Sequence, residues 1–143
     1  MTKRFLVLAL SLSFFLAAGF AQYGSLSHRE VKELVDDTHE LAAHFQDDFD
    51  EALGESIVDE TKLEGNYNER ADDLEDHLNQ AKEEVGEPDE FREHLDAAMQ
   101  AAFDVNEMMG ANRFPEKLGR DWDVIRGKLN VLAAVAGLKP LAR

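Results

Sequence analysis

Cysteine is absent from this chain of 143 residues. Its absence excludes disulfide bonds, a lipid-modified N-terminal cysteine, covalent attachment of a c-type haem and catalysis by a thiol nucleophile. A protein of this size normally forms one domain with one core. We therefore expect the fold to depend on the packing of side chains alone.

Positive charge and catalytic motifs are also scarce. The chain has 15 Lys and Arg against 30 Asp and Glu, a formal net charge of −15. An acidic surface repels nucleic acid and anionic lipid, so neither is an expected partner. The sequence contains neither a Gly-x-Ser-x-Gly nucleophile elbow nor a glycine-rich phosphate loop. We expect a protein that is not an enzyme, and we assign no catalytic residue.

Long apolar runs are limited to the beginning of the sequence. A run without charge covers residues 5–18, only 14 residues and short of the roughly 20 that a membrane-spanning helix needs. Basic residues precede it, and Gly19-Phe20-Ala21 follows it with small residues where signal peptidase cleaves. We expect a secretory signal peptide over residues 1–21 and one mature domain over 22–143. The mature protein would be periplasmic or extracellular, without stable membrane insertion.

Apolar residues recur at helical spacing through the rest of the chain. The clearest stripe has intervals of 4, 3, 4, 3 and 4 and consists of Leu118, Trp122, Ile125, Leu129, Leu132 and Ala136. Similar stripes occur over 27–54, 59–85 and 88–110. Mutual burial of four amphipathic helices is the simplest way to remove these stripes from water. The sequence predicts an all-α, antiparallel up-down four-helix bundle with Trp122 buried.

Local signals set the expected helix ends. Ser27 and Glu30 form a capping box, and the first helix should end at Gly54. Gly65 lowers helix propensity, so the second helix is either irregular there or begins after it. We expect Ile57 and Val58 to fold over the end of the bundle, and the last helix to begin at the proline at position 115 and end at Ala136.

Charge divides the mature chain into two unequal parts. Residues 22–110 carry 6 Lys and Arg against 27 Asp and Glu, a net charge of −21. Residues 111–143 carry 7 against 3, a net charge of +4. We expect five basic side chains either to face acidic helices or to lie in solvent, namely Arg113, Lys117, Arg120, Arg126 and Lys128.

A metal- or haem-binding bundle is the alternative function. The five histidines are His28, His39, His44, His77 and His94. Bundles that bind two irons use Glu-x-x-His pairs, whereas the nearest match here is Asp36-x-x-His39. The pairs Asp73–His77 and Glu90–His94 have spacings that suit only a surface metal. Methionines with a core spacing, Met99, Met108 and Met109, are the available haem partners. We assign no cofactor and no metal ligand.

The last helix also carries a family resemblance. The segment Asp121-Trp122-Asp123-Val124-Ile125-Arg126-Gly127-Lys128-Leu129-Asn130-Val131-Leu132-Ala133 resembles the closing segment of a family of uncharacterised exported bacterial helical-bundle proteins. The segments around Phe45 to Leu53, Asp59 to Asn68 and Met108 to Arg113 are similar to earlier parts of that family. The resemblance implies an exported helical bundle and no particular activity. We therefore expect a non-enzymatic interaction or structural role in the cell envelope, with an unknown envelope protein as a partner.

Overall fold

The computed structural model describes residues 26–54 and 62–143, which form four helices. Their bounds are α2 His28–Gly54, α3 Lys62–Glu83, α4 Pro88–Ala111 and α5 Glu116–Ala136. The described ranges contain no strand. The expected signal peptide and the Ile57-Val58 segment lie outside these ranges. The prediction of an all-helical fold is confirmed.

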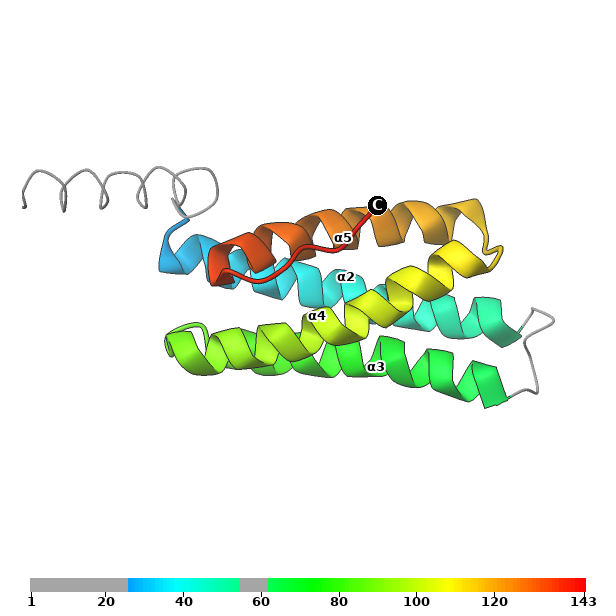
Figure 1. Ribbon diagram of the computed structural model, residues 1–143, viewed down its shortest axis with the longest axis horizontal. Coiled ribbons are helices and arrows are strands. Elements are labelled where there is room, and N and C mark those ends of the chain that lie inside the picture. Colours follow the sequence, from blue (N-terminus) through cyan, green and yellow to red (C-terminus); the bar gives the residue numbers. More distant parts are fainter. Residues whose placement is uncertain (1–25, 55–61) are drawn as a thin grey trace, which may run out of the picture.

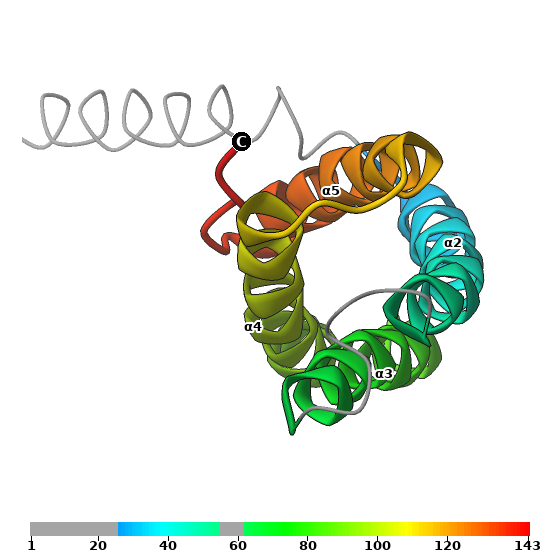
Figure 2. The same cartoon turned by 90° about the vertical axis from the view of Figure 1, so that its right-hand side faces the viewer.

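The helices surround one core. Helix α2 lies against α3 and α5, and α4 lies against the same two helices. Figure 1 shows the long axes of the helices side by side, and Figure 2 looks along the bundle with the four helices around a common centre. The contact between α3 and α4 is the most extensive of the four, while that between α4 and α5 is the least extensive.

Side-chain and backbone caps define several helix ends. At the start of α2, the Ser27 amide donates to Glu30 Oε2 at 2.7 Å, and the Glu30 amide donates to Ser27 Oγ at 3.2 Å. This reciprocal pair is the predicted capping box. Helix α3 includes Gly65, so the alternative that it begins after this residue is wrong. Helix α5 ends at Ala136 and is capped by Gly137, whose φ of 69° is in the left-handed region.

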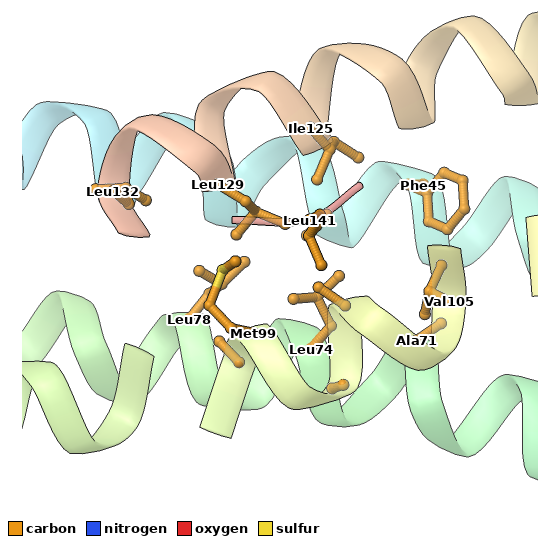
Figure 3. Close-up of a cluster of buried hydrophobic side chains, with 14 of the residues drawn as sticks. Phe45, Ala71, Leu74, Leu78, Met99, Val105, Ile125, Leu129, Leu132 and Leu141 are labelled. Carbon is orange, nitrogen blue, oxygen red and sulfur yellow. The ribbon is translucent and has the colours of Figure 1, made fainter. Parts of the chain in front are cut away.

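The predicted apolar stripes meet in the core. Phe45, Leu74, Val105 and Ile125 come from the four different helices and are all buried (Figure 3). Trp122, near the middle of the α5 stripe, is only 2% exposed, which confirms its predicted burial. The one buried polar residue in the described ranges is Thr38, and its hydroxyl donates to the Leu34 carbonyl at 2.6 Å.

The segment after α5 completes the wall between α4 and α5. The backbone turns back at Gly137, and Leu141 inserts its side chain into the core (Figure 3). Asn130 on α5 receives a hydrogen bond from the Leu141 amide at 2.7 Å and donates one to the Leu141 carbonyl at 3.2 Å. Asn106 on α4 donates to the Ala142 carbonyl at 3.1 Å. This segment lies against both α4 and α5, the pair of neighbouring helices with the least extensive contact.

Candidate functional site

Basic side chains of α5 bind the acidic helix α2 at two points. Lys117 Nζ lies 3.1 Å from Asp48 Oδ2, and Lys128 Nζ lies 2.7 Å from Asp37 Oδ2. Lys117 also contacts Asp121, 2.7 Å away on its own helix. Hydrogen bonds from Lys117 to Asp121 and then to Asp48 raise the pKa of the lysine above its ordinary value. These two lysines therefore face an acidic helix, which is one of the two outcomes expected for the five basic residues.

The other three basic residues gather around a cavity at the connection between α4 and α5. Arg113 lies in that connection, while Arg120 and Arg126 lie on α5. A fourth arginine, Arg143, joins them from the segment after α5. The cavity measures about 580 Å³ and also includes Trp122 in its wall. We call it the arginine pocket, defined by the four arginines and Trp122.

The four arginines differ in their partners. Arg120 Nη1 lies 2.9 Å from Glu116 Oε1, and Arg126 Nη2 lies 2.7 Å from Asp123 Oδ1. Both carboxylates are on α5 and are mostly exposed to solvent, so the pairs are easily exchanged. Arg113 and Arg143 are exposed and have no ion-pair partner within the described residues. The pocket thus contains two guanidinium groups that the described protein leaves unneutralised.

A hydrogen-bond network connects the pocket to the core. The Trp122 indole N–H donates to Asn106 Oδ1 at 2.9 Å, and Arg126 Nη1 donates to the same oxygen at 3.3 Å. Asn106 also binds the Ala142 carbonyl with its amide nitrogen. A group that binds Arg126 is therefore connected through Asn106 to the indole of Trp122, the chain's single tryptophan.

Two helical glycines, Gly110 and Gly119, line the pocket as well. A Cβ atom built at either position would meet no other group within 4 Å. Glycine inside a helix costs about 1 kcal/mol relative to alanine, and packing explains neither residue. The fold would accept alanine at both positions, where a methyl group would take up space at the pocket wall.

The histidines do not converge. His39 Nε2 lies 3.4 Å from Glu75 Oε1, and His77 Nδ1 lies 3.4 Å from Gln80 Oε1. His28 and His44 line two separate surface cavities. Within the described ranges, no three histidine or carboxylate side chains come together as a metal site would require. The methionines proposed as haem ligands pack in or against the core, with Met99 and Met108 buried.

Two of the three carboxylates in the candidate metal pairs have other partners. Asp36 binds Lys82 on α3, and Asp73 binds Arg70 at 3.2 Å. The hydrogen bond from Lys82 lowers the pKa of the Asp36 carboxyl below its ordinary value of 3.8. The same bond raises the pKa of Lys82. These pairs connect or stabilise helices and provide no ligand set.

Sequence reasoning missed the asparagines that hold the last segment. Asn130 interrupts an apolar stretch of α5, and Asn106 lies next to Val105 of the α4 stripe. Both positions are half-buried, and a polar side chain at such a position is a signal for a polar contact. Leu141 was also missed, because it follows the proline that ends the helical pattern. These residues build the wall next to the arginine pocket.

None of the described helices is long and apolar enough to cross a membrane. The chain matches no protein-family model, no curated protein and no solved structure.

Proposed function

We propose that this protein is an exported, non-enzymatic four-helix bundle that binds a protein partner in the cell envelope through the arginine pocket. The observation that carries the proposal is the grouping of Arg113, Arg120, Arg126 and Arg143 around one open cavity. The rest of the molecule is strongly acidic.

Electrostatics makes this grouping a candidate binding site. Like charges on a folded protein repel one another, and a cluster persists at least cost where a partner of opposite charge neutralises it. At physiological ionic strength the Debye length is about 8 Å, so the distant acidic helices are largely screened from the pocket. A partner would therefore respond mainly to the charges of the pocket itself, which are four guanidinium groups and the carboxylates of Glu116 and Asp123.

Export is the second part of the proposal. It rests on the basic residues, the apolar run over 5–18 and the small residues up to Ala21 in the sequence. The likeness of the Asp121 to Ala133 segment to exported bacterial bundles supports the same location.

An antiparallel up-down arrangement is the third part of the proposal. Contacts between opposite ends of helices that lie side by side support it. Lys82 near the end of α3 binds Asp36 near the start of α2, and Arg92 near the start of α4 donates to the Ala136 carbonyl at the end of α5. The connections over 84–87 and 112–115 are short, as this topology requires.

Affinity capture from the native envelope tests the partner with a matched pair of variants. Arg120→Glu changes the pocket, and Arg29→Glu makes the same change of charge at the start of α2. Both arginines are exposed, and each pairs with a glutamate four residues away at 2.9 Å. Figure 1 shows the start of α2 and the connection between α4 and α5 at opposite ends of the bundle.

We expect a protein that is captured by the wild type and by Arg29→Glu to be lost with Arg120→Glu. Equal capture by both variants would contradict the proposal, because the partner would then bind without the pocket. Capture of nothing by the wild type would contradict it as well.

A further inference from the structure

We infer that the ligand of the arginine pocket is an acidic polypeptide segment, whose carboxylates the guanidinium groups bind. This inference rests on the proposed function and adds the chemical class of the partner. It stands on three observations: the partners that the arginines already have, the shape of the adjoining wall, and the two glycines.

Carboxylates already occupy the rim of the pocket. Glu116 and Asp123 bind Arg120 and Arg126 at 2.9 and 2.7 Å, so the geometry of these guanidinium groups suits a carboxylate. Arg113 and Arg143 have no such partner within the described residues. Guanidinium groups bind carboxylates through planar, paired donors, which lysine does not provide. Two of the four arginines thus bind carboxylates of the protein itself, and the other two are available to carboxylates of a partner.

The adjoining wall already accommodates an extended polypeptide. Residues 138–143 lie along α4 and α5, and Asn106 and Asn130 bind the backbone of Leu141 and Ala142. Arg143 belongs both to this segment and to the pocket. A partner chain in the pocket would thus lie next to a surface that already binds an extended backbone. The indole of Trp122 and the ring of Phe114 line the pocket as well.

Gly110 and Gly119 lie in the pocket wall although packing requires glycine at neither position. A Cβ atom at Gly119 would meet nothing within 4 Å, so helix α5 loses stability at this residue without a gain in packing. Gly127 on the same helix has equally free space and does not line the pocket. The two positions form a matched pair, since alanine should stabilise α5 at both and place a methyl group in the pocket wall only at Gly119.

Fluorescence anisotropy of a labelled glutamate-rich peptide, titrated with the purified protein, tests the inference. A glutamine-for-glutamate peptide is the uncharged control, and citrate and inorganic phosphate as competitors distinguish a polypeptide from a small anion. Emission of Trp122 provides a second signal, because Arg126 and the indole share Asn106 Oδ1.

We expect the glutamate peptide to bind and the glutamine peptide to fail. Gly119→Ala should weaken binding about fivefold while raising the melting temperature by a few degrees. Gly127→Ala should raise the melting temperature equally and leave the affinity unchanged. Arg113→Ala should also weaken binding about fivefold, because one guanidinium contact is lost.

Three results would overturn the inference: equal binding of the two peptides, unchanged affinity of Gly119→Ala, or citrate or phosphate binding more tightly than the peptide. The outcome is separable from that of the proposed function. If a partner is captured through the pocket and the glutamate peptide does not bind, the proposed function stands and the acidic class is wrong. If the peptide binds and no partner is captured, the proposed function is wrong and the chemistry of the pocket is right.

Discussion

Replacing Trp122 by alanine should remove a large part of the stability of the bundle. Its side chain is 2% exposed, its ring centroid lies 5.3 Å from that of Phe45, and its N–H donates to Asn106. Truncation of a buried tryptophan to alanine costs about 3–5 kcal/mol through lost burial and the cavity that remains. That loss compares with a total of about 5–15 kcal/mol for an ordinary domain.

A second variant separates packing from hydrogen bonding. Trp122→Phe keeps an aromatic ring next to Phe45 and removes the indole donor. Asn106 Oδ1 still accepts from Arg126 at 3.3 Å, so its oxygen is not left without a donor. We expect this variant to cost only about 1–2 kcal/mol, which is the range for one hydrogen bond together with a small change in packing.

Urea denaturation followed by circular dichroism measures both losses. The midpoint should fall while the slope stays constant if each variant changes stability alone. A loss below about 1 kcal/mol for Trp122→Ala would refute this reasoning. Wild-type tryptophan emission at the wavelength of a water-exposed indole would refute the burial on which it rests.

Three further predictions concern other parts of the fold. Asn130→Ala should cost about 1–3 kcal/mol in urea denaturation, because the backbone of Leu141 loses both of its hydrogen bonds to the Asn130 side chain, whereas an unchanged midpoint would show that the last segment is dispensable. A chain that ends at Gly110 should be largely unfolded at low salt by circular dichroism and should regain part of its helix as salt or magnesium screens its carboxylates; full helicity without salt would show that α5 is not needed. In NMR titration the carboxyl of Asp36 should have a pKa below 3.8, and Lys82→Met should raise it. The Asp36–Lys82 pair stabilises the fold at pH values above the unfolded-state pKa of Asp36, and this contribution is lost as pH falls through the lower pKa of the folded state. An unchanged pKa of Asp36 in Lys82→Met would contradict the role of Lys82.

Helix type and burial were predictable because they follow from spacing. The stripe from Leu118 to Ala136 depends on a period close to 3.6, and the structure buries its centre as expected. Capping by Ser27 and Glu30 was equally accessible, since both partners lie within one helical turn. Such local signals need no knowledge of how the helices meet.

The arginine pocket could not be predicted as a site. Its wall includes both Arg143, which follows the last helix, and Arg113 from the connection before α5. The spacing of residues in the sequence does not indicate that these two arginines lie at the same cavity. Two outcomes were expected for the basic residues, and only Lys117 and Lys128 face an acidic helix, because they bind α2. Arg120 and Arg126 pair instead within α5 because their carboxylate partners lie three or four residues away.

Site-specific photo-crosslinking in living cells tests the proposed partner most directly. A photoreactive residue in place of Arg113 lies at the pocket, and one in place of Arg29, in the first turn of α2, serves as the control. Figure 1 shows the start of α2 and the connection between α4 and α5 at opposite ends of the bundle. We expect a discrete crosslinked envelope protein from position 113 that is absent from position 29 and disappears when Arg120→Glu is added. The same crosslinked protein from both positions, or from position 113 regardless of Arg120→Glu, would contradict binding through the arginine pocket.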